Sequence, residues 1–388
     1  MKGSVAEVFG AFLRLGLTSF GGPVAHLGYF REELVIRRKW LTEPAYAEIV
    51  ALCQFLPGPA SSQVGFALGL VRAGWGGALA AFVAFTLPSA VLLVALAYAS
   101  LQSAGPLAGG ALHGLKIVAV AIVAQAVWGM AKALCPDGPR AGIAVAAVAL
   151  LAVLPGAAGM MGAIGLGALA GLALRRGQAS GAPPLPVPVS RKAGLAALVV
   201  FLILLAGLPL LAPAGQPLAV IDGFYRAGSL VFGGGHVVLP LLQAETAPWV
   251  TEDAFLAGYG LAQAVPGPLF TFAAWLGAVM DPAPNGIAGA IIALLALFLP
   301  GFLILIAALP FWGRIRQRRA AQSAMQGANA AVVGILGAAL YDPVFTSAIV
   351  GRADLALALV CFVALTVWRL PPWLVVGIAA AGGILLHG

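Results

Sequence analysis

The chain has 388 residues, of which 62% are hydrophobic and only 9% are charged. A soluble domain carries about 25% charged residues, so this composition excludes a water-facing surface and indicates one that faces lipid. The net charge of +8 does not indicate a nucleic-acid partner, because the Lys and Arg residues lie in short loops between apolar runs. The sequence therefore predicts an all-α integral membrane protein whose first partner is the lipid bilayer.

The apolar segments, taken in chain order, form two groups of six around a linker. The first segment carries Glu7 and Arg14 where a cleavable signal peptide needs an uninterrupted apolar stretch, so we expect no such peptide. Residues 175–192 are Pro-rich and basic, as linkers often are, and the run that follows is long enough to cross a bilayer. We expect about thirteen segments, several broken by Gly or Pro: 5–30, 45–71, 75–100, 107–134, 141–155, 157–174, 193–211, 220–242, 253–280, 285–310, 321–340, 354–369 and 371–387.

Five landmarks recur in the same order in both halves, which indicates a duplication. RLGLTSFGG at 14–22 matches RAGSLVFGG at 226–234, and QFLPGP at 54–59 matches QAVPGP at 263–268. We therefore divide the chain into an N-terminal repeat (1–174), a linker with one connecting helix (175–214) and a C-terminal repeat (215–388). The other matching pairs are 40–43 with 249–252, 87–88 with 299–300, and 113–114 with 326–327.

The charges of the loops predict an inverted topology for the two repeats. Loop 31–43 contains four Lys or Arg residues, whereas its counterpart 243–253 contains none. Loop 101–112 has none, whereas its counterpart 313–319 contains four Arg residues. Because basic loops face the cytoplasm, the expected cytoplasmic loops are 31–43, 175–192 and 313–319, and the expected external loop is 243–253.

Under this topology, segment 45–71 begins and ends on the same side of the membrane. It is expected to be a re-entrant hairpin that folds back at 57–59, where the sequence is PGP. The same argument predicts that segment 5–30 folds back at 21–23. Full but broken spans are the alternative interpretation.

Four Gly/Pro breaks interrupt the segments, and they form two symmetry-related pairs. They are FGGP at 20–23, PGP at 57–59, FGGGH at 232–236 and PGP at 266–268. Irregular backbone inside a membrane is tolerated only where protein or a watery cavity covers it. Inverted-repeat transporters place substrates at such breaks, where half-helix N-termini point free N–H groups at an anion. The alternative is that the breaks only permit kinks or close helix packing.

Polar side chains next to these breaks are candidate ligands for an anion. Ser61 and Ser62 follow the first PGP element, and Thr271 follows the second, so each could offer a hydroxyl. His26 and His236 flank the two Gly-rich breaks without being strict equivalents. Capping or packing is the alternative role for both histidines.

Ionisable residues within the spans are few, and each is a functional candidate. Arg14 and Arg226 are repeat equivalents, each seven residues before a Gly-Gly break; snorkelling to the interface is the alternative. Lys116 lies deep in an apolar run and has Asn329 as its counterpart. Glu48 is a candidate proton relay in the first PGP hairpin, with a place at the membrane interface as the alternative.

Signatures of enzymes and cofactors are missing from the sequence. It contains no HExxH, Walker loop, GxSxG, or GxGxxG in a βαβ setting, so we expect neither an enzyme nor a self-contained ATP-driven pump. Cys53, Cys135 and Cys361 are far apart, and no His/Cys spacing indicates a metal or redox site. We therefore expect no cofactor and no metal.

The duplicated FGGP/FGGGH and Q-x-x-PGP elements, with Trp-Leu-Thr-Glu between them, resemble the chromate ion transporter family in its long, two-domain bacterial form. The resemblance covers essentially the whole chain. It implies a multi-pass protein of the bacterial inner membrane that exports chromate and so confers chromate resistance. It further implies that transport is driven by the proton motive force or by anion exchange. The resemblance also implies that some members of the family transport sulfate, a tetrahedral dianion of the same shape.

The resemblance and the residue patterns together give one expected binding set. The alternatives to a chromate exporter are a sulfate or other oxyanion uptake permease of the same fold and a non-transporting membrane scaffold. Transport direction, coupling ion and a homodimeric state are left open. The expected set is Arg14, Gly21, Gly22, His26, Gln54, Pro57, Gly58, Pro59, Ser61, Ser62, Lys116, Arg226, Gly233, Gly234, His236, Gln263, Pro266, Gly267, Pro268 and Thr271, with Glu48 as proton relay.

Overall fold

The computed structural model describes residues 3–20, 22–102, 106–175, 188–232, 235–315 and 317–387, and every regular element in these ranges is a helix. The N-terminal repeat and the connecting segment contain α1 (Val5–Thr18), α2 (Gly22–Phe30), η1 (Arg31–Arg37), α3 (Glu43–Phe55), α4 (Ala60–Gln102), α5 (Pro106–Leu134), α6 (Gly138–Val153), α7 (Ala157–Leu174), α8 (Arg191–Leu211) and η2 (Ala212–Ala214). The C-terminal repeat contains α9 (Gln216–Ser229), η3 (Gly235–Val237), α10 (Val238–Thr246), α11 (Glu252–Ala264), η4 (Leu269–Thr271), α12 (Phe272–Val279), α13 (Gly286–Ala308), η5 (Leu309–Phe311), α14 (Trp312–Ile315), α15 (Arg319–Ala339), η6 (Leu340–Phe345), α16 (Thr346–Ala348), α17 (Arg352–Thr366) and α18 (Pro372–His387).

Helix ends follow from local chemistry. The Ser4 hydroxyl accepts the Glu7 N–H at the start of α1, and Thr251 caps α11 in the same way. Helix α3 ends at Phe55 because Pro57 and Pro59 carry no N–H to continue its hydrogen-bond ladder. The breaks expected from the sequence are therefore real interruptions of the helices.

Five helical stretches within the described residues are long and apolar enough to cross a membrane. The remaining apolar helices are shorter, so the number of membrane segments, expected to be about thirteen, stays a prediction. The five stretches are Ala60–Ser100, Leu107–Leu134, Arg191–Ala214, Gly286–Ile315 and Arg319–Ala348.

Helix α4 is not one straight rod, because it turns back on itself at Ala73 and Gly74. These two residues have non-helical dihedral angles, with φ of +67° at Gly74. A Cβ atom added to Gly69 would lie 2.3 Å from the Gly77 carbonyl oxygen. In a straight helix these two residues would be about 12 Å apart. The stretch 60–100 therefore forms two antiparallel arms, 60–72 and 75–100.

The first segment of each repeat also folds back at its Gly-rich break. In the N-terminal repeat, the Trp40 indole N–H donates to Glu7 Oε1 at 2.9 Å, and the rings of Phe12 and Phe30 lie 5.5 Å apart. In the C-terminal repeat, Arg226 Nη1 of α9 lies 3.5 Å from Glu245 Oε1 of α10. This geometry matches the expected hairpin shape, and the side of the membrane on which each arm begins and ends remains a prediction.

The PGP segment of the C-terminal repeat forms a similar hairpin. The Trp275 indole N–H of α12 donates to the Ala254 carbonyl of α11 at 3.0 Å, and the rings of Phe255 and Phe272 lie 5.1 Å apart. The Asp281 N–H, just after α12, also donates to the Trp249 carbonyl, just before α11, at 2.9 Å, so the two helices run antiparallel. The PGP element lies at the tip of this hairpin.

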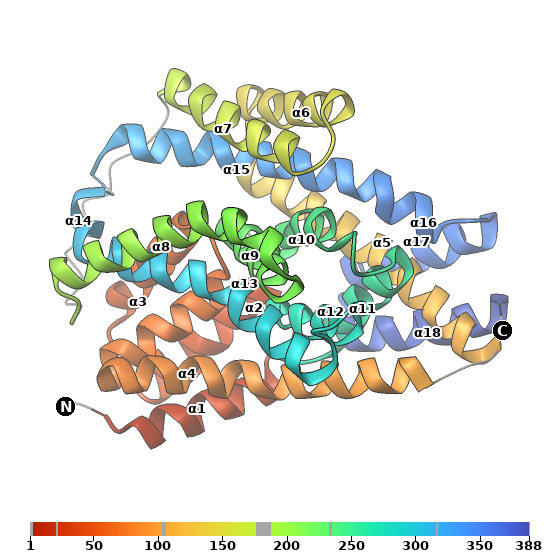
Figure 1. Ribbon diagram of the computed structural model, residues 1–388, viewed down its shortest axis with the longest axis horizontal. Helices are drawn as coiled ribbons and strands as arrows, with labels where there is room; N and C mark the ends of the chain where they lie inside the picture. Colours follow the sequence, from red (N-terminus) through yellow and green to blue (C-terminus); the bar gives the residue numbers. More distant parts are fainter. Residues whose placement is uncertain are drawn as a thin grey trace.

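The two repeats exchange their last helices. Helix α7 packs on α15 of the other repeat, and α18 packs on α5, as Figure 1 shows at the upper and right-hand edges of the molecule. Glycines allow both approaches: an added Cβ on Gly327 would lie 2.0 Å from the Gly167 carbonyl, and one on Gly114 would lie 2.1 Å from the Ala379 carbonyl. Small residues at helix interfaces are the usual means of close packing in membranes.

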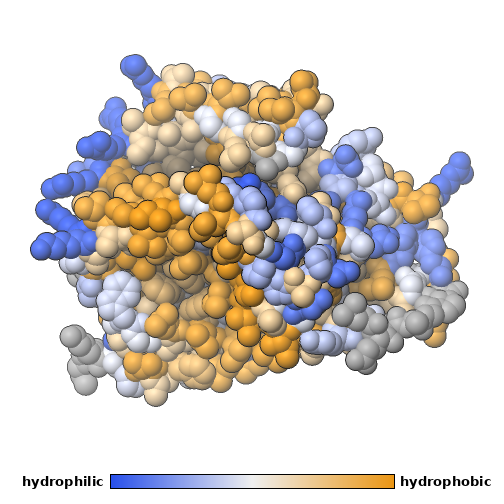
Figure 2. Space-filling model, in the orientation of Figure 1, coloured by the Kyte–Doolittle hydropathy of each residue, from blue (hydrophilic) through white to orange (hydrophobic). Residues whose placement is uncertain are grey.

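Figure 2 shows hydrophobic residues over much of the visible face, with hydrophilic residues at its left edge and in a broad area from the centre toward the right. Helix α14 and the beginning of α8 lie at the same left-hand end in Figure 1, near the N-terminus. Helix α14 overlaps loop 313–319 and α8 begins within segment 175–192, two stretches whose cytoplasmic location is a prediction from the sequence. An extensive apolar surface of this kind is what a bilayer-spanning protein requires.

Candidate functional site

Two reciprocal backbone hydrogen bonds join the four breaks at the centre of the protein. The Gly58 N–H donates to the Val231 carbonyl at 2.7 Å, and the Gly267 N–H donates to the Ser19 carbonyl at 2.9 Å. Val231 and Ser19 are repeat equivalents, and each directly precedes an FGG element. Each PGP glycine is therefore bound to the Gly-rich break of the other repeat. Reciprocal contacts of this kind relate the two repeats by an approximate two-fold axis.

Steric contacts at the two PGP glycines follow the same axis. Both glycines have positive φ, +119° at Gly58 and +105° at Gly267, which L side chains rarely adopt. A Cβ on Gly58 would lie 2.9 Å from Gly301 Cα, and one on Gly267 would lie 2.8 Å from Ser89 Oγ. Ser89 and Gly301 are equivalent positions, each directly after a proline inside a long helix. Glycine is thus required at both tips by backbone conformation and by space.

The first PGP element presents the N-terminus of α4. The helix begins at Ala60, so the first-turn N–H groups that follow Pro59 have no acceptor within the helix. Ser61 Oγ lies 3.4 Å from His26 Nδ1, while the buried Ser62 Oγ has no hydrogen-bond partner among the described residues. The Gln63 amide N–H₂ donates to the carbonyls of Pro57 and Gly301, at 2.9 and 2.8 Å, and ties this turn to α13.

The second PGP element is more self-contained. The Thr271 hydroxyl donates to the Pro268 carbonyl at 2.7 Å, so it is already used within its own turn. His236 Nδ1 and the Tyr259 hydroxyl form a hydrogen bond of 2.7 Å. Gln263 Nε2 is buried and lacks a partner among the described residues. The two breaks therefore offer different chemistry despite their shared backbone.

A pocket of about 430 Å³ adjoins the first PGP element, and we call it the Gln54 pocket. Pro23 of α2, Gln54 of α3, Gly58 and Ala60 line it, together with Asn329 of α15 from the other repeat. None of the described residues that line it is charged. It combines an amide-bearing wall with the open N-terminus of α4, where the helix dipole favours an anion.

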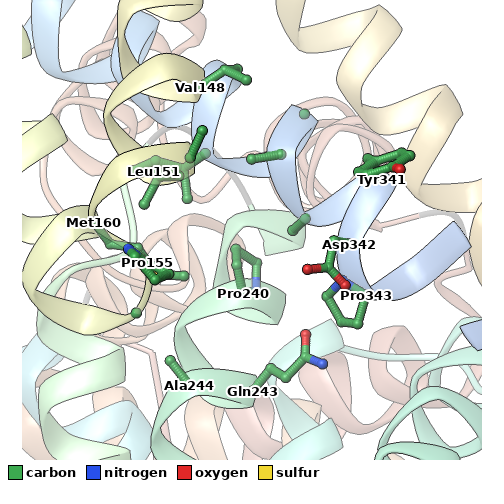
Figure 3. A pocket seen from close by; sticks show the side chains of 16 residues that line it. Val148, Leu151, Pro155, Met160, Pro240, Gln243, Ala244, Tyr341, Asp342 and Pro343 are labelled. Carbon is green, nitrogen blue, oxygen red and sulfur yellow. The ribbon is translucent and has the colours of Figure 1, made fainter. Parts of the chain in front are cut away.

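A second pocket, of about 560 Å³, lies between α6, α7, α10 and the end of α15. Figure 3 shows its apolar wall of Val148, Leu151 and Met160, with Gln243 and Asp342 as polar groups on the other side. The Asp342 carboxylate would repel a dianion, and no Lys or Arg is among the described residues that line the pocket. The Gln54 pocket is therefore the better candidate anion site, although it is the smaller one.

The three cations expected at the site lie outside the Gln54 pocket. Arg14 is exposed. Arg226 is paired with Asp222 and Glu245, and Lys116 Nζ lies 2.8 Å from Asp253 Oδ1. The charges of Arg226 and Lys116 are thus balanced by carboxylates.

Glu48, the expected proton relay, is buried on α3, six residues before Gln54. The Trp312 indole N–H donates to its Oε2 at 3.2 Å. Trp312 belongs to the other repeat, so this carboxylate also lies at the contact between the repeats. The proton-relay role of Glu48 stays a prediction.

Two residues of the expected set, Gly58 and Gln54, line one pocket. The two breaks of the N-terminal repeat contain or adjoin further members of that set: Gly22, His26, Pro57, Pro59 and Ser61. Gly21, Gly233 and Gly234 lie outside the described residues, so the Gly-rich breaks are described only in part. The sequence analysis missed Ser19, Val231, Ser89 and Gly301 as partners of the PGP glycines. The fixed offset marks Ser19 with Val231, and Ser89 with Gly301, as repeat equivalents, but it does not show what they contact.

The fold and the central breaks define a helical membrane transport protein with two related repeats. The chain belongs to the chromate transporter family: the family model described as "Chromate transporter" matches residues 6–172 and again residues 218–384. Every regular element in the described ranges is a helix, as the sequence analysis expected.

Several curated proteins are similar to this chain along most of its length. A chromate transport protein of Pseudomonas aeruginosa is 29% identical over 348 residues, which is 87% of this chain and 81% of that protein. A probable chromate transport protein of Synechococcus elongatus is 28% identical over 98% of this chain and 95% of its own length. An uncharacterized transporter of Methanocaldococcus jannaschii is 26% identical over 86% of this chain and 83% of its own length. No solved structure matches.

Proposed function

We propose that the protein is a secondary active transporter that moves the chromate oxyanion out of the cell across the bacterial inner membrane. Membership of the chromate transporter family supports this, as do the similar proteins of Pseudomonas and Synechococcus whose names specify chromate transport. The proposal includes the direction of transport, which is efflux, and its energy source, which is the proton motive force or anion exchange.

The observation that carries the proposal is the reciprocal pair of hydrogen bonds at the four breaks, from Gly58 to Val231 and from Gly267 to Ser19. Irregular backbone at the contact between two related repeats is where inverted-repeat transporters bind their substrates. The charge bias of the loops supports a two-fold axis in the membrane plane, and the repeats would then open toward opposite sides. Rocking of one repeat against the other would then expose the site alternately.

We propose the Gln54 pocket as the place where the oxyanion binds. A tetrahedral dianion needs several hydrogen-bond donors, and the α4 first turn, the Ser62 hydroxyl and the Gln54 amide are neutral donors near the pocket. The α4 N-terminus adds roughly half a positive charge. The remaining charge would come from Arg14 or from a co-transported proton, because Arg226 and Lys116 are balanced by carboxylates.

Glu48 is the residue that we propose couples protons to transport. Its burial and its contact with Trp312 of the other repeat make its environment dependent on the relative position of the repeats. Glu48→Gln keeps the shape of the side chain but removes the titrating oxygen. We expect this variant to lose pH-gradient-driven flux and to retain chromate counterflow exchange.

Radiolabelled chromate and sulfate flux in proteoliposomes, with an imposed pH gradient, tests the proposal. We expect saturable chromate flux that Gln54→Ala weakens by about tenfold or more, which corresponds to about 1.4 kcal/mol of binding. Gln243→Ala is the matched control, because Gln243 lines the pocket that contains Asp342. If Gln243→Ala is the damaging variant and Gln54→Ala is not, the Gln54 pocket is the wrong site.

A sulfate uptake permease of the same fold is the nearer alternative, because sulfate and chromate share charge and geometry. Sulfate flux that exceeds chromate flux, directed inward, would replace the proposed substrate and direction. A membrane scaffold is the alternative from another class, and it predicts no flux of either anion from correctly inserted protein.

A further inference from the structure

Three side chains that could bind a metal meet where α5, α17 and α18 come together, and none of them lines the Gln54 pocket. His113 Nε2 lies 3.3 Å from Asp354 Oδ1, and His387 Nε2 lies 2.7 Å from the same oxygen. The three ligand atoms all lie within 4.8 Å of one another. We call this group the His-Asp-His cluster.

The spacing of the cluster suits a transition-metal ion. Zinc takes nitrogen and carboxylate oxygen ligands at about 2.0–2.2 Å, so its tetrahedral ligand atoms lie about 3.4 Å apart. The separation of 3.3 Å between His113 and Asp354 is close to that value, and the separation of 2.7 Å between His387 and Asp354 is shorter. His387 is partly exposed near the end of α18, so a small movement of its side chain completes the geometry. We propose that the His-Asp-His cluster binds one divalent transition-metal ion of the Zn²⁺ type.

Backbone hydrogen bonds orient the Asp354 carboxylate for metal binding. Asp354 Oδ2 accepts the backbone N–H groups of Val350 and Gly351, at 3.0 and 2.9 Å, so Oδ1 is directed toward the histidines. Hydrogen bonds of this kind orient metal ligands in proteins. Asp354 is 1% exposed, and its ion-pair partners among the described residues are the two histidines alone. A buried carboxylate needs a positive charge beside it, and a metal ion supplies one.

The helix packing fixes the two histidines relative to each other. Glycines bring α5 and α18 close: an added Cβ on Gly383 would lie 2.3 Å from the Gly110 carbonyl. The imidazole rings of His113 and His387 are consequently 4.2 Å apart. The side chain of His387 is 39% exposed, which leaves an approach for the ion and for a water molecule as the fourth ligand.

The other repeat has the same helix packing without these side chains. Gln326 stands in place of His113, and the offset of 212 residues puts Arg175 and Gly142 in place of His387 and Asp354. The cluster is therefore not needed to build the shared fold. The C-terminal helices α17 and α18 would be joined to α5 by a metal that the equivalent helices α6, α7 and α15 do not use.

Metal binding by the purified full-length protein tests the inference directly. The protein should carry an affinity tag without histidine and be stripped with a chelator before titration with Zn²⁺. We expect one Zn²⁺ per chain by calorimetry and elemental analysis, a rise in Tm of several degrees, and visible d–d absorption when Co²⁺ replaces Zn²⁺. His387→Gln and Asp354→Asn should each weaken binding by about tenfold or more.

His236→Gln is the matched control, because His236 is bonded to Tyr259 and lies outside the cluster. It should bind Zn²⁺ as the wild type does. His387→Gln changes a partly exposed side chain at the end of a helix, so it tests the ligand without threatening the fold. Absence of stoichiometric binding to the wild type, or unchanged binding in His387→Gln, would overturn the inference. The readout is metal content and absorption, so it is independent of whether chromate transport is observed.

Discussion

Replacing Gly58 by alanine should damage this protein more than the same change at any glycine in open space. At φ of +119°, an alanine costs about 1–3 kcal/mol in backbone strain. Its Cβ would also lie 2.9 Å from both Gly301 Cα and Gln63 Nε2. Overpacking of this kind costs about 1–3 kcal/mol, because the Gly301 backbone cannot rotate away. The two terms together give about 2–6 kcal/mol.

The strain and the contact can be separated with matched variants. Gly74→Ala carries the φ cost alone, because Gly74 has φ of +67° and nothing within 4 Å of an added Cβ. Gly377→Ala carries neither cost, and within helix α18 it is expected to stabilise the protein by up to about 1 kcal/mol. Gly267→Ala should fall between Gly74→Ala and Gly58→Ala, because the Ser89 hydroxyl that it meets can rotate.

The assay combines thermal unfolding in detergent with chromate flux in proteoliposomes, normalised to inserted protein. We expect Gly58→Ala to lower Tm and flux the most, and a β-branched residue at Gly58 or Gly267 to abolish flux in protein that still inserts. If Gly58→Ala transports and unfolds like Gly377→Ala, the close approach of the PGP tip to α13 has no functional role.

Three further predictions concern topology and charge. Single cysteines in loops 31–43 and 313–319 should be labelled from the cytoplasmic side and cysteines in 243–253 from outside; equal labelling of 31–43 and 243–253 from one side contradicts the inverted repeat. Arg14→Gln should weaken chromate transport more than Arg14→Lys, whereas Arg226→Gln should affect it less, because carboxylates already balance Arg226; wild-type affinity in inserted Arg14→Gln would mean that Arg14 is only an interfacial anchor. Burial raises the pKa of Glu245, at the end of α10, and the positive charge of Arg226 opposes that rise. In Arg226→Gln we therefore expect the Tm to rise as the pH falls toward 4.5 and to decrease as the pH rises; a Tm that does not change with pH contradicts this coupling.

The sequence by itself determined the class of protein, the positions of the helix breaks and the family. These properties depend on composition and local chemistry: a 9% charged content excludes a water-facing surface, and Pro57 and Pro59 must end a helix wherever it lies. The duplication was also readable, because a repeat leaves the same residues at a fixed offset.

Only the tertiary structure decided which residues meet. The sequence paired PGP with PGP, but the structure bonds Gly58 to Val231 and Gly267 to Ser19, each across the repeats. The structure also pairs the positive charge of Lys116 with the carboxylate of Asp253, which lies 137 residues away in the chain. His113, Asp354 and His387 show no metal-binding spacing in the sequence and become one cluster only because α17 and α18 pack on α5. Contacts of this kind depend on helix packing and on glycines that permit close approach, so no local pattern in the sequence encodes them.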